Sequence, residues 1–230
     1  QVPADRPYAI REKEVTLQQA SGFNSMAEKA LSGATLTRQE CRAALACPDG
    51  HILQLLAAAF RVRQAHFGKK VSLHLLINAK SGLCPEDCSY CSQSSVSTAS
   101  IDKYPWLGED EILNGAREAK RAKAVRYCIV SSGRSPGDSE LQHLCRVVRR
   151  IKAEVGISIC ASLGLLTPEA AQLLKQAGVD RYNHNLNASQ RFYSQVCRTH
   201  TYQDRLRTLH HARASGLELC SGAIFGLGET

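Results

Sequence analysis

The sequence predicts an α/β fold: a TIM-like (β/α) barrel that stops after its fifth strand and is preceded by N-terminal helices. Strand-like segments alternate with helical segments five times between residue 69 and the end of the 230-residue chain. One helix follows each predicted strand, and the sequence has no glycine-rich dinucleotide-binding fingerprint. A doubly wound sheet is therefore the second choice. Because a complete barrel has eight strands, we expect residues 69–230 to be a partial barrel that lacks its C-terminal strands.

The first 68 residues are expected to form a helical extension. Thr37-Arg-Gln-Glu40 resembles a capping box, which predicts a helix from this point through about Cys47. A second helix is predicted over 50–66 and ends near Gly68. Residues 1–34 are polar and weakly periodic, so no element is assigned to them.

The barrel elements follow from the change to strand–helix alternation. Strands are predicted at 71–78, 124–131, 156–162, 179–185 and 217–225. Helices are predicted at 109–123, 139–154, 167–178, 189–197 and 201–216. Repeated alternation of this kind indicates a parallel sheet with right-handed crossovers.

The predicted strands have one apolar and one polar face, whereas parallel strands covered by helices normally read as continuous apolar runs. Period-two geometry puts the polar face in the barrel lumen. Three lumen positions are cysteines, Cys128, Cys160 and Cys220, which we call the strand cysteines. One such thiol reads as an ordinary buried cysteine, but three at matching parity favour a reaction chamber.

A run of asparagines continues this pattern on the fourth strand. Asn183, Asn185 and Asn187 share one parity and are expected to face inward, which leaves His184 facing outward. The alternative is a loop of turn-forming residues.

A second set of thiols follows the first predicted strand. Cys84, Cys88 and Cys91, the loop cysteines, lie at spacing C-x3-C-x2-C in the segment 83–95. The carboxyl ends of barrel strands carry the active site. Three thiolates there can bind three irons of a cubane cluster or three positions of a tetrahedral zinc ion, and either arrangement leaves one position open.

The loop motif, with Tyr90 before the last cysteine, resembles the signature of radical S-adenosylmethionine (SAM) enzymes. The segment GAIFGLGE, 222–229, has the G-x-I-x-G-x-x-E pattern that such enzymes often carry on the fifth strand. Longer segments, from about residue 70 to the end, resemble the biotin synthase family: GLCPEDCSYCSQS, YCIVSSGR, ICASLGLLTPE, DRYNHNLNAS, THTYQDRLRTL and LCSGAIFGLGET.

The resemblance implies an enzyme that inserts sulfur into dethiobiotin to form biotin. The loop cysteines would hold a [4Fe–4S] cluster that cleaves SAM, and the strand cysteines would be catalytic ligands of an auxiliary [2Fe–2S] sulfur donor, with Arg126 as a hydrogen-bond donor nearby. Family positions that bind SAM match Tyr90, Asn185, Asn187, Gly222 and Ile224, and positions near the substrate match Asn183 and Asn185. The family's fourth auxiliary ligand, an arginine on a later strand, has no match, so we expect the isolated chain to be inactive.

The resemblance also implies partners: an electron donor such as flavodoxin or ferredoxin, iron–sulfur assembly proteins and a second copy of the chain. Ten cysteines indicate a reducing compartment, so we expect the cytoplasm, or the mitochondrial matrix in a eukaryote. The formal charge of +8 is dispersed along helical segments, which argues against nucleic acid as a partner. No apolar run approaches the roughly 18 residues of a membrane-spanning helix, so no membrane is expected.

Two other functions remain open. One is another radical SAM barrel enzyme, such as a hydrogenase-maturation protein, and the other is a non-catalytic protein with zinc at the loop cysteines. The remaining cysteines, with His200, are interpreted as structural: Cys41, Cys47 and Cys145 on helices, and Cys197 near a helix end.

Overall fold

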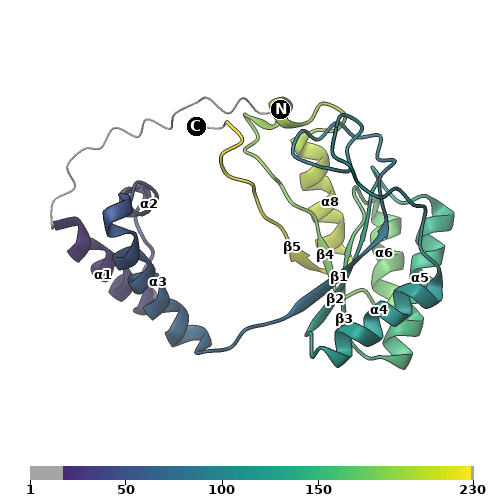
Figure 1. The fold of residues 1–230 in the computed structure, drawn as a ribbon, viewed down its shortest axis with the longest axis horizontal. Helices are drawn as coiled ribbons and strands as arrows, with labels where there is room; N and C mark the ends of the chain where they lie inside the picture. Colours follow the sequence, from purple (N-terminus) through teal and green to yellow (C-terminus); the bar gives the residue numbers. More distant parts are fainter. Residues whose placement is uncertain (1–17, 229–230) are drawn as a thin grey trace. The chain divides into compact units, whose positions relative to one another are not determined.

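The computed structural model describes residues 18–228, with side chains from residue 22 onward. The chain divides into two compact units, Gln1–Val71 and Ser72–Thr230. The division lies three residues beyond the boundary expected from the sequence. Figure 1 shows the helices of the first unit and the strands and helices of the second.

The N-terminal unit is helical. It contains α1 (Gln18–Leu31), α2 (Arg38–Leu45), a 3₁₀ turn (Asp49–His51) and α3 (Ile52–Phe67). α1 falls where the sequence assigned no element, because its stability comes from packing: Phe23 and Ala27 are buried with Ala58 of α3.

The capping box at the start of α2 is present as predicted. The Thr37 side chain accepts a hydrogen bond from the Glu40 amide at 3.2 Å, and the Glu40 carboxylate accepts one from the Thr37 amide at 2.6 Å. The same carboxylate pairs with Lys29 of α1 at 2.9 Å. These bonds satisfy amides that the first helical turn leaves free.

Among the described residues, no single helix is long and apolar enough to cross a membrane. One bent pair, Arg38–Leu45 with Asp49–Phe67, passes that test together by length and composition alone, with a bend of 105° between its halves.

The second unit is built on five parallel strands in the order β1-β2-β3-β4-β5. The strands are β1 (His74–Lys80), β2 (Arg126–Ser131), β3 (Ser158–Ser162), β4 (Arg181–Asn183) and β5 (Glu218–Cys220). The helices are α4 (Glu109–Arg121), α5 (Asp138–Glu154), α6 (Pro168–Ala177), α7 (Tyr193–Val196) and α8 (Tyr202–Ala214). The predicted alternation of parallel strands with helices is therefore confirmed.

The helices α4, α5, α6 and α8 contact one another in that order, α4 packs on β1 and β2, and α8 packs on β5. In Figure 1, α4, α5 and α6 lie on one side of the strands. The core between helices and sheet takes the apolar face of each strand, including Tyr127, Ile129, Ile159, Tyr182 and Leu217. The opposite face is left for polar residues and the strand cysteines.

Several strands differ in extent from the prediction. β1 begins at His74 and not at Val71, whose side chain is exposed. β5 is only three residues long, because the Gly222 carbonyl accepts hydrogen bonds from the amides of Leu186 and Asn187 outside the ladder. Beyond Asn183 and Cys220 the two segments stay side by side through these bonds and an isolated parallel bridge between Asn187 and Ala223.

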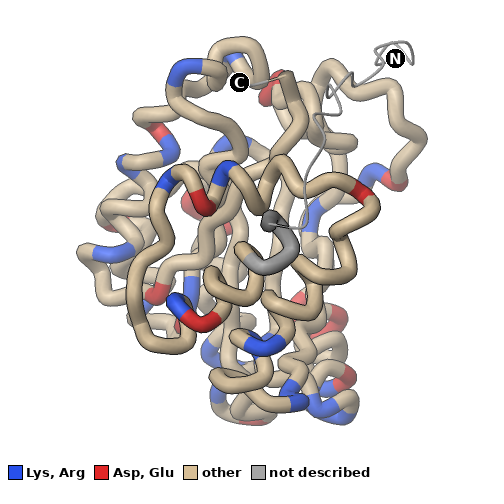
Figure 2. Tube along the Cα trace, turned by 90° about the vertical axis from the view of Figure 1, so that its left-hand side faces the viewer, with Lys and Arg blue, Asp and Glu red and all other residues tan. Residues whose placement is uncertain are grey.

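Lys and Arg are interspersed with Asp and Glu along the chain (Figure 2). On α4 and α5, Arg117 pairs with Glu154, and Arg146 and Arg150 pair with Glu109. These pairs match the expectation of solvated helix faces, since exposed ion pairs of this kind neutralise much of the local basic charge.

Candidate functional site

The loop cysteines line a cavity of about 230 Å³ at the carboxyl ends of the strands. Tyr90, Arg205 and all three asparagines of the 183–187 segment line the same cavity. The structure thus brings together the loop after β1, the ends of β2, β3 and β4 with the loops that follow them, and Arg205 of α8. The carboxyl end of a parallel sheet is where α/β enzymes bind their ligands.

The cysteine loop is anchored to a segment more than one hundred residues further along the chain. Asp87 accepts hydrogen bonds from the backbone amides of Arg198, at 2.9 Å, and Thr199, at 3.1 Å. The Ser89 amide donates to the Val196 carbonyl at 3.0 Å. The bond from the Arg198 amide, with others from Cys197 and Thr199, holds the pKa of Asp87 well below its usual range.

Glu86 is the buried carboxylate of this loop, 4% exposed. It accepts hydrogen bonds from the Thr199 hydroxyl, at 2.7 Å, and from Nδ1 of His200. Although burial raises the pKa of Glu86, these bonds outweigh burial and lower the pKa below its ordinary value. Burial lowers the pKa of His200.

Arg205 of α8 is a site residue that the sequence analysis missed. It is 8% exposed, and its guanidinium donates to the Asn185 carbonyl at 2.8 Å, to the Tyr90 hydroxyl at 3.3 Å and to the Tyr193 hydroxyl. An arginine on the buried face of a predicted helix was the available signal, because Arg205, Thr208 and Ala212 follow helical spacing. Its buried charge makes the cavity suited to an anionic group.

Asn187 reaches the same group of side chains. Its backbone has φ of +65°, and its amide nitrogen donates to the Tyr90 hydroxyl. Ile224 donates its amide to the Asn187 carbonyl at 2.7 Å, and the Gly222 carbonyl accepts from the Asn187 amide at 3.1 Å. Gly222 and Ile224 thus contact the backbone that positions Asn187, and they are not among the residues that line the cavity.

Polar atoms without partners gather along the strand ends. Within the described residues, the buried oxygens Oδ1 of Asn183 and Oδ1 of Asn78 have no hydrogen-bond partner, and neither does Nε2 of His184. Buried polar groups are nearly always paired, so these atoms indicate a bound polar ligand or ordered water.

The sequence predicts an outward orientation for His184, and its ring lies 6.2 Å from that of Tyr182, a residue of the core between sheet and helices. His184 is 5% exposed and belongs to the cavity wall. Burial, with the charges of Arg205 and His200, lowers the pKa of His184 to about 3.

The strand cysteines lie on the sheet face opposite the core. Cys128 and Cys160 are direct register partners, and Cys220 is opposite Asn183. A hydrogen bond from Cys160, with the charges of Arg126 and Arg181, lowers the pKa of Cys128 to about 7, despite burial. The hydrogen bond to Cys128, burial and the charges of Cys128 and Cys220 raise the pKa of Cys160. Cys128 and Cys160 are therefore neighbours on this face, and Cys220 lies on the same face two strands from Cys160.

Arg126 lies on the same face, as expected. It donates to the Ser158 hydroxyl at 3.2 Å and contacts Glu218 at 3.4 Å. Arg181, the register partner of Cys160, pairs with the same Glu218 carboxylate at 2.7 Å. Two guanidinium groups therefore lie beside the strand cysteines.

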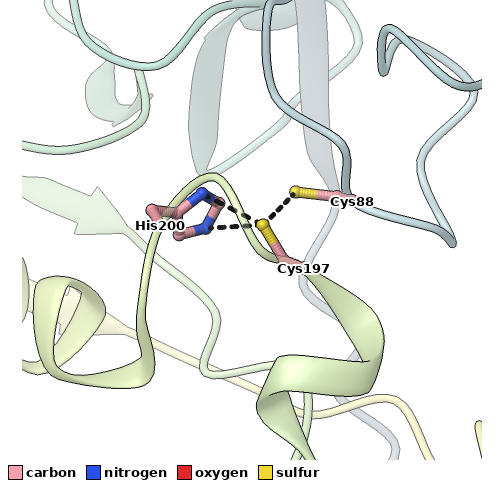
Figure 3. Close-up of side chains that lie close together, drawn as sticks. All are labelled: Cys88, Cys197 and His200. Carbon is pink, nitrogen blue, oxygen red and sulfur yellow. Dashed lines mark hydrogen bonds between the residues drawn. The ribbon is translucent and has the colours of Figure 1, made fainter.

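Cys197 and His200, interpreted above as structural, are brought to Cys88. Figure 3 shows the three side chains converging from the cysteine loop and the segment after α7. Their ligand atoms all lie within 4.8 Å of one another, and all three residues are buried. We call them the buried Cys–His group. In the part of the chain that the structure describes, the loop cysteines do not form such a compact set.

The residues fit the groups that the sequence implied. Three thiols spread around a cavity with a buried arginine suit a cluster whose irons take separate ligands and whose open position faces an anionic molecule. The strand cysteines, with two neighbouring guanidinium groups, suit a second and separate iron–sulfur group. The unpartnered oxygen of Asn183 provides an acceptor for a bound ligand.

Comparison with known families agrees with this site. A sequence profile described as the Radical SAM superfamily matches residues 80–230. The chain belongs to the radical SAM superfamily. The matched range contains the loop cysteines, the strand cysteines and Arg205.

Curated relatives indicate which kind of superfamily member the chain is similar to. The chain is 47% identical over 214 residues to a biotin synthase of Bacillus cytotoxicus, 93% of this chain and 64% of the relative. It is 49% identical over 205 residues to a biotin synthase of Geobacillus kaustophilus, 89% of this chain and 62% of the relative. It is 51% identical over 205 residues to one of Bacillus velezensis, 89% of this chain and 60% of the relative. The chain thus spans somewhat more than three fifths of the length of these relatives.

Solved structures support the fold. Methylornithine synthase (PylB) matches with a TM-score of 0.79 at 21% identity, over 89% of this chain and 60% of that one. The FeFe-hydrogenase maturase HydG from Carboxydothermus hydrogenoformans matches with a TM-score of 0.75 at 23% identity, over 92% of this chain and 50% of that one. At this identity the likeness is one of fold.

Proposed function

We propose that the chain carries the catalytic core of a biotin synthase, a radical SAM sulfurtransferase that converts dethiobiotin to biotin. The identity of 47–51% to curated biotin synthases supports this substrate. The single observation that carries the proposal is that the chain has two separate sets of thiols, one in the cavity loop and one on the inner face of the strands. A superfamily enzyme that only cleaves SAM needs the first set, whereas sulfur insertion needs a sulfur source as well.

The loop cysteines are proposed ligands of a [4Fe–4S] cluster, with its open position directed into the cavity. When bound, this cluster would supply the electron that cleaves SAM to a 5′-deoxyadenosyl radical. The chain's own contribution is to hold the thiols, and it does so through the bonds of Asp87 to the 198–199 backbone.

The polar wall of the cavity is proposed to bind SAM. Arg205 supplies a buried positive charge for the carboxylate, and Asn185, Asn187 and Tyr90 supply amide and hydroxyl groups for the remaining polar atoms. Gly222 and Ile224 act through the Asn187 backbone that they contact.

The strand cysteines are proposed ligands of an auxiliary [2Fe–2S] sulfur donor. Arg126 and Arg181 lie beside them and offset the negative charge of deprotonated thiols. Asn183, with its unpartnered Oδ1 and its register contact to Cys220, is proposed to bind dethiobiotin between the two thiol sets.

The proposal includes partners that the reaction requires. These are a low-potential electron donor such as flavodoxin or ferredoxin, iron–sulfur assembly proteins and a second copy of the chain. The bacterial relatives support a cytoplasmic location, and a eukaryotic host would place the reaction in the mitochondrial matrix.

The test is anaerobic iron–sulfur reconstitution of the chain, read by iron, acid-labile sulfide and the visible spectrum. Cluster binding is measured because the chain spans only part of its relatives' length. We expect two cluster components in the wild-type chain. The triple variant Cys84→Ala/Cys88→Ala/Cys91→Ala loses the cubane component and keeps the [2Fe–2S] component, and Cys128→Ala/Cys160→Ala/Cys220→Ala does the reverse.

The matched control is Cys41→Ala, because this thiol is exposed on a helix of the other unit and both components are expected to remain. Circular dichroism establishes that each variant is folded before its spectrum is compared. A folded, colourless chain that holds zinc but no iron contradicts the proposal, as does one cluster that disappears in both triple variants.

A further inference from the structure

The buried Cys–His group has an arrangement that neither proposed cluster uses. The sulfur of Cys88 lies 3.7 Å from the sulfur of Cys197. The Cys197 sulfur lies 3.3 Å from Nδ1 and 3.8 Å from Nε2 of His200 (Figure 3). All three residues are at least 93% buried, at 7%, 3% and 6% exposed.

These separations match ligands of one tetrahedral metal ion. With Zn–S of about 2.3 Å and Zn–N of about 2.0 Å, tetrahedral angles place two sulfurs about 3.8 Å apart and a sulfur and nitrogen about 3.5 Å apart. A disulfide would require sulfurs about 2.0 Å apart. The observed spacing is therefore that of two thiolates and an imidazole around a single ion.

Surrounding residues support a histidine ligand. Glu86 accepts the hydrogen bond of His200 Nδ1, the carboxylate–histidine contact that orients metal-bound imidazole and leaves Nε2 for the ion. Nε2 now meets the Tyr193 hydroxyl at 2.8 Å, a contact that metal binding would replace. The Cys197 thiol donates a hydrogen bond to Asp87 at 3.2 Å, which fixes the metal-free thiol and which metal binding would also replace.

Charge is also balanced at this position. The negative groups would be two thiolates and the carboxylates of Glu86 and Asp87. They are offset by a divalent ion, by the buried guanidinium of Arg205, and by Arg134 and Arg198, which pair with Glu86 and Asp87. A buried charge without such compensation would be costly. Thiolate and imidazole ligands select zinc, and they also suit iron(II), over magnesium or calcium.

We propose that Cys88, Cys197 and His200 form a site for a single thiophilic divalent cation, with zinc(II) as the probe. Cys88 belongs both to this group and to the loop cysteines, so the ion and the proposed cubane cluster exclude one another. The exclusion rests on the proposed function, whereas the metal site does not. Before a cluster is present, the cysteine loop would therefore hold a single metal ion through Cys88.

The test is a titration of the reduced, metal-free chain with zinc(II) in competition with a chromophoric chelator. We expect one tight site. Cys197→Ser and His200→Asn should each weaken it by about 100-fold or more, since loss of an outer contact alone costs 10–100-fold. The matched controls Cys84→Ser and Cys91→Ser should keep the wild-type affinity, because neither belongs to the group.

A second measurement does not depend on the folding of any variant. Burial already slows alkylation of Cys88 and Cys197, so the readout is the change in rate: zinc(II) should slow both further than in the metal-free chain, while Cys84 and Cys91 keep their metal-free rates by mass spectrometry. Protection of all three loop cysteines with Cys197 reactive would overturn the proposal and put zinc in the loop, and so would unchanged binding in folded Cys197→Ser.

Cluster reconstitution separates this proposal from the previous one. Cys197 is no cluster ligand, so Cys197→Ser should still take up the cubane cluster. Prior zinc loading should inhibit that uptake in the wild-type chain and have little effect in the variant. If no cluster forms in either chain but zinc binds as expected, the proposed function fails and the metal site stands.

Discussion

At the scale of single residues, burial in the cavity wall controls ionisation. His184 is 5% exposed, and its Nε2 has no hydrogen-bond partner among the described residues. Burial is the main cause that lowers the pKa of His184 to about 3, and the charges of Arg205 and His200 lower it further. The imidazole is therefore neutral at physiological pH and adds no positive charge beside Arg205.

This pKa predicts a pH dependence of stability. An unfolded histidine has a pKa of about 6.5, so between pH 6.5 and 3 the unfolded chain binds a proton that the folded chain does not. The free energy of unfolding should thus fall as pH falls through this window. We expect urea unfolding to show a shallower pH slope in His184→Asn than in wild type, by up to one proton. Equal slopes would mean that His184 protonates in the folded chain.

At the scale of elements, α4 approaches the sheet closely at one glycine. A Cβ added at Gly115 would lie 2.3 Å from the Tyr127 hydroxyl and 3.5 Å from Cδ1 of Ile77. The Tyr127 hydroxyl donates to the Ile112 carbonyl at 3.0 Å inside the core. Gly115 therefore allows a strand side chain to bond the helix backbone.

The contact predicts the outcome of a double-mutant cycle. Gly115→Ala gains about 1 kcal/mol of helix propensity, but overpacking against Tyr127 costs about 1–3 kcal/mol, so we expect net destabilisation. Tyr127→Phe alone should cost about 1 kcal/mol through its lost hydrogen bond. Because it removes the clashing oxygen, the double variant should be more stable than the sum of the single changes predicts. Additive free energies of unfolding would refute the close contact.

At the scale of the whole molecule, the chain consists of two units with an exposed connection. Residues 69–73 are exposed and outside any helix or strand, and the division falls between Val71 and Ser72. Arg63 donates to the Gly68 and Lys70 carbonyls at 2.8 and 2.7 Å, so only this end of the connection is tied to α3.

The connection predicts where a protease cuts. Within residues 22–228, limited trypsin digestion should begin after Lys69 or Lys70, because exposed backbone without ladder bonds is cut first. The fragment from residue 70 or 71 onward should resist further digestion. Lys69→Gln/Lys70→Gln should delay this cleavage, which mass spectrometry detects. Earlier cleavage inside the sheet unit would show that the unit is not compact by itself.

Strand alternation and local caps could be predicted because they depend on neighbours in sequence. The alternation of Tyr127 and Ile129 with Cys128 predicted which face meets the helices, and the structure buries the first two in the core. The Thr37 capping box likewise needs only residues three positions apart.

Contacts between distant segments could not be predicted in this way. Arg205 was missed because its partners, Asn185 and Tyr90, lie 20 and 115 residues away. α1 was missed because Phe23 and Ala27 need α3 to bury them. Helical spacing can place such a residue on the buried face of its helix, but only the packing of distant segments decides which partners it meets.

The sequence by itself determined the strand–helix order, the inward parity of the strand cysteines and the motif of the loop cysteines. Only the tertiary structure decided that Cys88 meets Cys197 and His200, across 109 residues in the first case. Periodicity and spacing are local properties of a chain. Whether two loops meet depends on the length and register of the strands that carry them. Those are properties of the whole sheet.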